Sequence, residues 1–120
     1  MPERRLEYVG RSLRDLREFP EDVQDIVVFA LLEAQEGRKH LDAKPLTGFG
    51  GASVMEVALT FRTDAYRVVY TVRFPGVVYV LHAFKKKSKK GSETPKRDLE
   101  LIRQRLQEAT RLHAQGEQHD

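Results

Sequence analysis

Two stretches of alternating apolar and polar residues, at 55–61 and 66–74, followed by an apolar run at 77–84, constrain the fold most. Alternation with a period of two is typical of β-strands, whose side chains point to opposite faces of a sheet. The apolar run predicts a central strand, buried on both faces. Pro75-Gly76 predicts a tight turn, because proline fixes φ and glycine accepts positive φ. The three segments together predict an antiparallel meander.

Helical patterns precede this meander. Residues 4–9 fit a short edge strand, and Ser12 then predicts a helix N-cap, with Asp15 completing a capping box. Pro20 ends this first helix and begins a second. The second helix is predicted from an apolar face made by Val23, Ile26, Val27, Ala30, Leu31 and Ala34. Gly37 favours its end.

The remaining segments complete the predicted architecture. The glycine-rich stretch 44–51 predicts a connecting loop, and Thr94-Pro95 predicts the start of a C-terminal helix. The predicted fold is α+β, with two N-terminal helices, a three- or four-stranded antiparallel sheet and a C-terminal helix. We expect a single domain over residues 1–120, with residues 115–120 as a frayed tail.

The charge distribution points to a phosphate-bearing partner. The 120 residues have a net charge of +3, but residues 81–97 alone carry seven Lys/Arg against one Asp/Glu. A local basic block attracts phosphate more strongly than a diffuse surplus does. A solvated lysine-rich loop is the alternative reading. No cysteine is present, the N-terminus has no apolar leader, and no apolar run reaches membrane-span length, so we expect a cytoplasmic protein without a membrane segment.

Basic residues fall at positions that suit contacts to a nucleic-acid backbone. Arg67 and Arg73 lie on one face of the predicted strand 66–74, roughly 20 Å apart at the usual strand rise. The strand 77–84 runs directly into Lys85-Lys86-Lys87-Ser88-Lys89-Lys90. Repulsion among close lysines lowers their pKa values, so one of them can exchange protons near neutral pH while the others stabilise a phosphate. A charged solvent face of an antiparallel sheet explains the arginines equally well.

Histidine offers a second source of proton transfer. His82 lies inside the apolar strand, where it is either a proton shuttle or a packed, hydrogen-bonded residue. The other histidines are scattered and build no metal-ligand spacing, and no Ser-His-Asp arrangement is present. The sequence therefore predicts neither a metal site nor a cofactor.

Three motifs resemble a known family: residues 66–72 (YRVVYTV), residues 80–88 (VLHAFKKKS) and residues 94–96 (TPK). Together with the Lys-Pro-Leu-x-Gly loop, they are similar to the phage-derived HigB-like branch of the RelE/ParE toxin superfamily. The resemblance covers about residues 5–114. It implies the toxin of a type II toxin–antitoxin pair, a ribosome-dependent mRNA endoribonuclease that uses no metal. It also implies a helix-turn-helix antitoxin as partner, together with the ribosome and mRNA.

The resemblance also implies roles for particular residues. It implies catalytic roles for Arg67, Lys86, Lys87 and His82. Contacts to RNA or the ribosome are expected from Arg73, Lys85, Lys89 and Lys90. Two lysines that RelE carries on the preceding strand are replaced here by Glu56 and Ala58. The Lys85–Lys90 block, helped by His82, is expected to supply the missing charges.

Two alternatives share this fold. A ParE-like toxin would inhibit DNA gyrase by protein contact and would not need a cationic cluster. A non-catalytic RNA-binding module would bind RNA with a steep salt dependence and never cut it. We expect the antitoxin to cover the basic surface or to restrain the N-terminal helices of residues 12–36, whose net charge is acidic.

Overall fold

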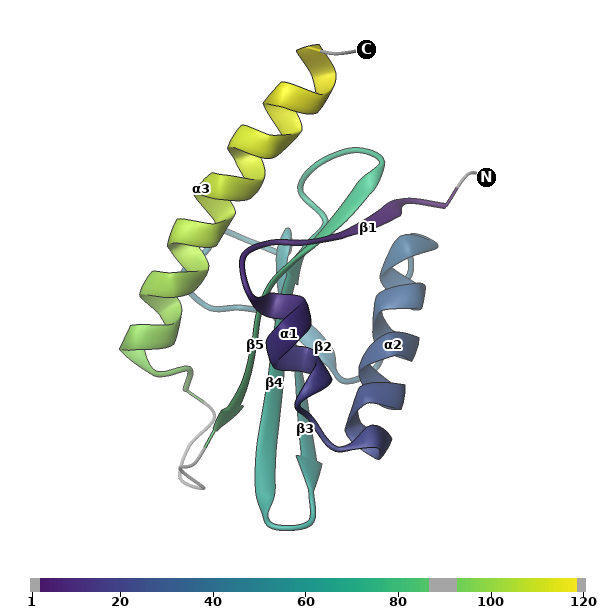
Figure 1. Ribbon diagram of the computed structural model, residues 1–120, viewed down its shortest axis with the longest axis vertical. Coiled ribbons are helices and arrows are strands. Elements are labelled where there is room, and N and C mark those ends of the chain that lie inside the picture. Colours follow the sequence, from purple (N-terminus) through teal and green to yellow (C-terminus); the bar gives the residue numbers. More distant parts are fainter. Residues whose placement is uncertain (1–2, 87–92, 119–120) are drawn as a thin grey trace.

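The computed structural model describes residues 3–86 and 93–118 as a twisted sheet with helices on both faces. Figure 1 shows the third helix along one face of the sheet and the first two helices along the other. The elements, in chain order, are β1 Arg5–Tyr8, α1 Ser12–Arg17, α2 Glu21–Gln35, β2 Ala43–Pro45, β3 Val54–Phe61, β4 Asp64–Thr71, β5 Val77–Lys86 and α3 Lys96–Gln118.

The sheet has five strands in the order β1-β5-β4-β3-β2. The α+β class, the two N-terminal helices and the central meander are confirmed, but the predicted count of three or four strands is too low. The strand that was not predicted, β2, has only three residues, of which the last two fall in the predicted loop 44–51. A segment that short shows no alternation. β1 is an edge strand, as predicted, but it pairs parallel to β5, so the sheet is not purely antiparallel.

Each sheet face has its own apolar core. The α2-facing core packs Val27, Ala30 and Leu31 against alternate residues of β3 and β4, such as Val57 and Val68. The α3-facing core is formed by Val9, Leu46, Phe49, Val54, Val69, Val77, Tyr79, Leu81, Ile102, Leu106 and Ala109. Covering both faces explains why β5 is apolar along most of its length.

Two predicted helix caps have other partners. Ser12 is the first residue of α1, not its N-cap, and no side chain caps that helix. The Ser12 hydroxyl is fully buried and donates to the carbonyl of Val80, 3.1 Å away. The predicted cap at Thr94 also fails, because its hydroxyl donates to the carboxylate of Glu56. Both hydroxyls therefore satisfy tertiary contacts that local sequence rules do not describe.

The ends of the strands and helices refine the predicted boundaries. β4 ends at Thr71 and does not continue to Phe74, while Gly76 has a φ of 79°, as the predicted turn requires. α3 runs to Gln118, past Gly116 where fraying was expected. Among the described residues, no helix combines the length and apolar character needed to cross a membrane.

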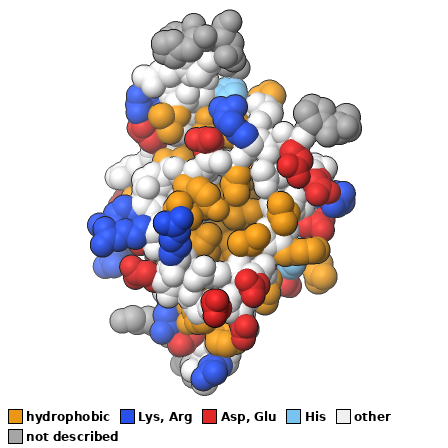
Figure 2. All heavy atoms as spheres, turned by 45° about the vertical axis from the view of Figure 1, so that its right-hand side comes forward, with side chains coloured by type: hydrophobic (Ala, Val, Ile, Leu, Met, Phe, Trp, Pro, Cys, Tyr) orange, Lys and Arg blue, Asp and Glu red, His pale blue; other side chains and the backbone are white. Residues whose placement is uncertain are grey.

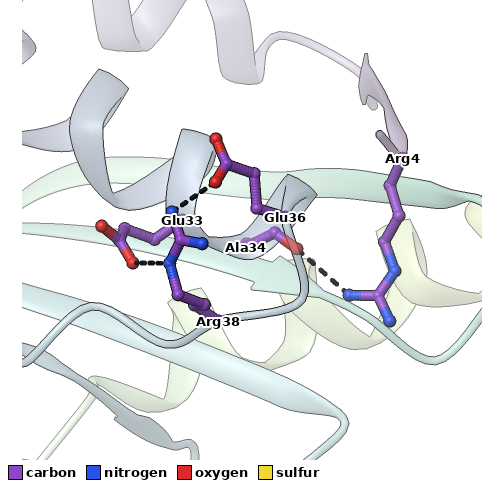
Figure 3. Close-up of polar contacts among 5 residues, drawn as sticks. All are labelled: Arg4, Glu33, Ala34, Glu36 and Arg38. Atoms are coloured by element: carbon purple, nitrogen blue, oxygen red, sulfur yellow. Dashed lines mark hydrogen bonds and ion pairs between the residues drawn. The ribbon is translucent and has the colours of Figure 1, made fainter. Parts of the chain in front are cut away.

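The C-terminal end of α2 is hydrogen-bonded to Arg4, the residue just before β1 (Figure 3). The backbone N–H of Arg4 donates to the carbonyl of Gln35, and the Arg4 guanidinium donates to the carbonyl of Ala34 at 3.1 Å. The guanidinium of Arg38 bridges Glu33 and Glu36 at the same end. The Arg4 contacts therefore join the end of α2 to the residue just before β1, whereas the Arg38 contacts stay within the helix end.

Candidate functional site

The α3-facing side of the sheet brings four titratable side chains together near the end of β5. In the strand register, Glu56 lies beside Val69 and His82, and the next row holds Arg67 beside Phe84. Lys86 lies one row further, beside Ala65. Arg67 is therefore a diagonal neighbour of the other three residues, which places two cations, a carboxylate and an imidazole on one small area.

A β-bulge decides which β5 residues face this site. The register shifts between Val69 and Tyr70, which pair with His82 and Val80, so Leu81 is an extra residue in β5. Val80, before the bulge, packs in the α2-facing core, but Phe84, after it, packs in the α3-facing core. A bulge reverses the facing of every later residue. It thereby brings His82 and Lys86 to the face that carries Arg67.

Glu56 and Arg67 form a buried ion pair at the centre of the site. Nη1 of Arg67 lies 3.0 Å from Oε1 of Glu56, and the side chains of Arg67 and Glu56 are only 8% and 5% exposed. The second carboxylate oxygen, Oε2, accepts a hydrogen bond of 2.8 Å from the Thr94 hydroxyl. Thr94 precedes α3, so the start of that helix lies over the pair. Such a pair places a proton acceptor beside a delocalised cation that can bind phosphate oxygens.

His82 joins β5 to α3. Its Nε2 lies 2.8 Å from Oδ1 of Asp98, its Nδ1 lies 3.3 Å from Nη1 of Arg105, and its ring stacks on Phe84. Because a guanidinium can only donate, Nδ1 accepts and Nε2 carries the proton that is donated to Asp98. Burial lowers the pKa of His82 below its ordinary value of 6.5, and Asp98 opposes that shift. The structure thus shows a packed, hydrogen-bonded histidine.

The basic residues that the sequence predicted at the site do not all lie there. Lys86 is buried on the site face, whereas Lys85 points to the opposite face and pairs with Asp64 at 3.2 Å. Lys87, Lys89 and Lys90 lie outside the described residues. Arg73 lies beyond the end of β4, where its Nε donates to the Ser53 hydroxyl. The strand that was predicted to carry both Arg67 and Arg73 ends at Thr71, so Arg73 is not part of it and the two arginines do not lie on one strand.

A cavity of about 400 Å³ opens beside the ion pair. Its lining includes Glu56, Thr94, Lys44, Thr47 and Leu99, so the carboxylate borders both the cavity and Arg67. Glu93 lines it as well, so the cavity is bordered by two carboxylates and one lysine. Within residues 3–86 and 93–118, no three His, Asp or Glu side chains gather in a way that would hold a metal ion.

The comparison with protein families identifies the group to which this sequence belongs. Residues 14–107 match the model of the phage-derived protein Gp49-like family. That match spans α1 to the middle of α3 and so includes every residue of the candidate site. The chain belongs to the Gp49-like family. The phage-derived family that the sequence motifs indicated is confirmed by this match.

Solved structures give this Gp49-like protein a RelE fold. It is similar to a doubly substituted Escherichia coli toxin RelE in the free state, with a TM-score of 0.54, 24% identity, and coverage of 74% of this chain and 90% of RelE. It is also similar to a chain of the intact E. coli RelBE toxin–antitoxin complex, with a TM-score of 0.51, 23% identity, and coverage of 71% and 99%. A search of curated proteins found no match.

Sequence reasoning did not assign a role to Glu56. It was noted only as a replacement for a lysine of RelE, yet it forms the closest described polar contact of Arg67. The signal was present in the alternation of residues 55–61, where Glu56 falls on the face opposite Met55 and Val57. An ionisable residue in the first strand of a meander, on the polar side of that strand, is a candidate partner for an arginine on the polar side of the second.

Proposed function

We propose that this protein is the toxin of a type II toxin–antitoxin pair and cleaves mRNA on the ribosome. The observation that supports the proposal most is the Glu56–Arg67 pair, buried beside Lys86 at the end of β5, where the sequence is lysine-rich. The RelE fold supports it, because one similar structure is a toxin and another is a toxin–antitoxin complex. The proposal places the protein in the cytoplasm, where ribosomes are found.

The proposed reaction is internal attack by the 2′-oxygen on the adjacent phosphate. Glu56 accepts the proton of the 2′-hydroxyl, and the new bond between the 2′-oxygen and phosphorus forms as the bond to the 5′-oxygen breaks. Arg67 binds the non-bridging oxygens, where charge accumulates in the transition state. The leaving 5′-oxygen takes a proton from Lys86 or Lys87. The cations replace a metal in this scheme, so none is required.

The remaining residues position the site and bind its substrate. His82 holds the first turn of α3 through Asp98 and so keeps Thr94 over Glu56. Lys85, Lys89 and Lys90 contact the RNA or ribosomal backbone, and Arg73 contributes from the far end of the sheet. Phosphate contacts of this kind set the position and the salt dependence of binding more than the chemistry.

The burial of the Glu56–Arg67 ion pair supports the proposal that RNA cleavage depends on the ribosome. Glu56 satisfies Arg67 and Thr94 at once, so an RNA phosphate reaches Arg67 only after the start of α3 has moved. Binding energy from the ribosome supplies that rearrangement, as remote contacts do in many enzymes. The free protein is therefore expected to cut naked RNA slowly.

A paired substitution tests the proposal without leaving a buried charge unpaired. Glu56→Met together with Arg67→Met removes both charges at similar volume, a change that is often neutral for stability. Mapping mRNA 5′ ends after brief induction should show cleavage by the wild type and by a Lys39→Ala control, and none by the folded double variant. Cleavage by that variant at the wild-type level would refute the assignment of the site.

A second candidate function rests on the same burial. An ion pair this enclosed is also compatible with a purely structural role in a ParE-like gyrase inhibitor or an RNA-binding module. Overexpression separates the candidates: arrest of translation supports mRNA cleavage, whereas induction of the DNA-damage response supports gyrase. An RNA-binding module would bind RNA without producing new 5′ ends.

The proposed partner is a helix-turn-helix antitoxin encoded beside the toxin. Co-expression with the product of the neighbouring reading frame should relieve toxicity, and the two proteins should co-purify. If that product neither binds nor protects, the toxin–antitoxin proposal fails while the chemistry of the site remains testable by cleavage.

A further inference from the structure

A second cavity, of about 310 Å³, lies at the C-terminal end of α2, on the sheet face opposite the Glu56–Arg67 pair. Segments that are far apart in sequence form its walls, among them Arg4 before β1, Gly37 and Arg38 after α2, and Met55, Tyr70 and Val72 in or just after β3 and β4. Met55 and Tyr70 are register partners, so they lie side by side on the sheet. We call this hollow the α2-end cavity.

Tyr70 brings a hydroxyl without a hydrogen-bond partner to the α2-end cavity. The residue is only 1% exposed, and its hydroxyl forms no hydrogen bond with the residues that the structure describes. A buried tyrosine hydroxyl usually has such a partner. Because the hydroxyl lies at the tip of a side chain that lines the cavity, a ligand there can accept a hydrogen bond from it. Burial raises the pKa of Tyr70 to about 12, so the hydroxyl keeps its proton at neutral pH.

Arg4 supplies a positive charge in a fixed position at the same cavity. Its guanidinium donates to the carbonyl of Ala34 at 3.1 Å (Figure 3), and its own carbonyl accepts from the Gln35 side chain at 2.7 Å. A guanidinium has about five N–H donors, so most of those on Arg4 stay available. No carboxylate in the described part of the chain forms an ion pair with Arg4. An arginine held in this way can bind the two oxygens of a carboxylate or phosphate group.

The end of α2 does not oppose an anion in the cavity. Gly37, with a φ of 81°, donates its N–H to the carbonyl of Ala34, and the N–H of Arg38 donates to the carbonyl of Glu33. This Schellman arrangement satisfies the last carbonyls of the helix, where the dipole is negative. The carboxylates of Glu33 and Glu36 are both paired with the Arg38 guanidinium (Figure 3). The negative groups nearest the cavity are therefore already bound.

The rest of the cavity wall is apolar, with Pro45, Ala52, Met55 and Val72 among its residues. Binding sites for small molecules combine such walls with a few polar groups, and their volumes begin at roughly 300 Å³. The α2-end cavity lies at this lower limit. Its size and lining therefore favour a ligand with one charged group and an apolar body about as large as a single ring.

The outward surface of α2 does not attract anions by itself. Residues 21–36 contain five acidic residues and no lysine or arginine. Ile26, which was expected to face the core, is instead 40% exposed. Figure 2 views this side of the molecule and shows hydrophobic side chains gathered over its middle, with acidic side chains beside and below them. An anion bound at the end of α2 is therefore held by the cavity and not by a diffuse positive field.

We propose that the α2-end cavity binds a small organic anion, whose carboxylate or phosphate group contacts Arg4 and Tyr70 and whose apolar body packs on Met55 and Val72. The Tyr70 hydroxyl and the Arg4 guanidinium then both gain an acceptor. The ligand lies on the α2-facing side of the sheet, whereas Glu56 faces the other side. Its binding can therefore be measured without any assay of RNA cleavage.

Calorimetric titration of the full chain with phenyl phosphate and with benzoate tests the proposal and distinguishes the two anionic groups. At least one of them should bind with a Kd of about 1 mM or lower. Inorganic phosphate lacks the apolar body and benzyl alcohol lacks the charge, so each should bind at least about tenfold more weakly. The proposal is overturned if neither aromatic anion binds at about 10 mM, or if inorganic phosphate binds as tightly as they do.

Tyr70→Phe removes only the hydroxyl, which has no partner among the described residues. The variant should unfold at the wild-type temperature or above it, and it should bind the aromatic anion about tenfold or more weakly, because a hydrogen bond to a charged group is lost. Tyr79→Phe is the matched control, since Tyr79 packs in the α3-facing core, and it should leave binding unchanged. Wild-type affinity in Tyr70→Phe would overturn the proposal.

Arg4→Gln tests the charge. It should weaken binding at least about tenfold and make the remaining binding insensitive to salt. Arg111→Gln is the control, because Arg111 is an exposed arginine on α3, paired with Glu108, and it should change neither property. Equal losses in Arg4→Gln and Arg111→Gln would show a general charge effect and overturn the proposal. Because Arg4 also holds the end of α2, circular dichroism checks that the variant is folded, and Tyr70→Phe decides the outcome if it is not.

Discussion

The two faces of the sheet are both covered by a helix, yet they are built from different side chains. The α2-facing core is apolar, with residues such as Val57, Val68 and Leu31 packed together. The α3-facing side buries Glu56, Arg67 and His82 among its apolar residues, and Lys86 at its edge. Helix α2 covers its face with apolar contacts, whereas on the other face Asp98 of α3 contacts His82 and Thr94, just before α3, donates to Glu56.

This difference separates an apolar face that stabilises the fold from the face on which we propose that the chemistry takes place. Burying a charge requires its removal from water, and well-packed apolar residues of the same size are often at least as stable. The α2-facing core shows that this chain can cover a sheet face without charges. The charged cluster on the other face therefore supports the proposed catalytic site, and four measurements test the contrast.

The largest effect is expected from breaking the buried pair on one side only. Arg67→Ala should lower the free energy of unfolding by about 3–5 kcal/mol, because it leaves Glu56 buried without its cation. Glu56→Met with Arg67→Met should cost far less or even stabilise the protein by about 1–4 kcal/mol. Urea unfolding followed by circular dichroism gives both values. If the single and double variants lose the same free energy of unfolding, the unpaired Glu56 carboxylate carries no burial penalty and the expectation is wrong.

The α2-facing core should affect stability without affecting chemistry. Leu31→Ala should lower the free energy of unfolding by about 2–5 kcal/mol, because it opens a cavity among fully buried side chains. Below its unfolding temperature, the variant should cleave at the wild-type rate on programmed ribosomes. Leu112→Ala, at an exposed position, should stay within about 0.5 kcal/mol of the wild type. If Leu31→Ala is folded but does not cleave RNA, the α2-facing core also affects the reaction, and the expected difference between the two faces is wrong.

The α3-facing side should affect chemistry while stability is largely kept. Arg67→Lys retains the charge beside Glu56 but loses the planar fork that holds two phosphate oxygens. Removing such a contact entirely slows a reaction by roughly 10²–10³, and lysine should recover only part of that loss. Single-turnover cleavage at saturating toxin isolates the chemical step from binding. An unchanged rate would make Arg67 a structural residue.

The smallest effect concerns pH and His82. Because burial lowers the pKa of His82 in the folded protein, folding favours the neutral ring. The corresponding stability is present above about pH 6.5, the unfolded value, and is lost as the pH falls through the lower folded value. His82→Gln should therefore reduce the fall in stability between neutral and acidic pH. The difference between the wild-type and variant curves cancels the other histidines, and parallel curves would contradict the expectation.

Much of the fold was predictable because it depends on local patterns. The alternation of residues 55–61 and the turn at Pro75-Gly76 gave β3 and the β4–β5 connection. The three-residue β2 was missed because it is too short to have a period. Ser12 and Thr94 were assigned to helix caps, but their hydroxyls bind groups that are distant in sequence. Arg67 and Lys86 were expected at the site, whereas Glu56 was not given a role there.

The sequence by itself determined the class of the fold, the position of the basic block and the placement of Glu56 and Arg67 on the polar sides of their own strands. These follow from periodicity and composition, which are properties of short stretches of chain. Only the tertiary structure decided that His82 and Lys86 join them, because the extra residue Leu81 in β5 reverses the facing of every later side chain. Strict alternation after Val80 would have placed both on the α2-facing side. A bulge depends on how two strands pair, and that pairing is fixed by packing across the whole sheet.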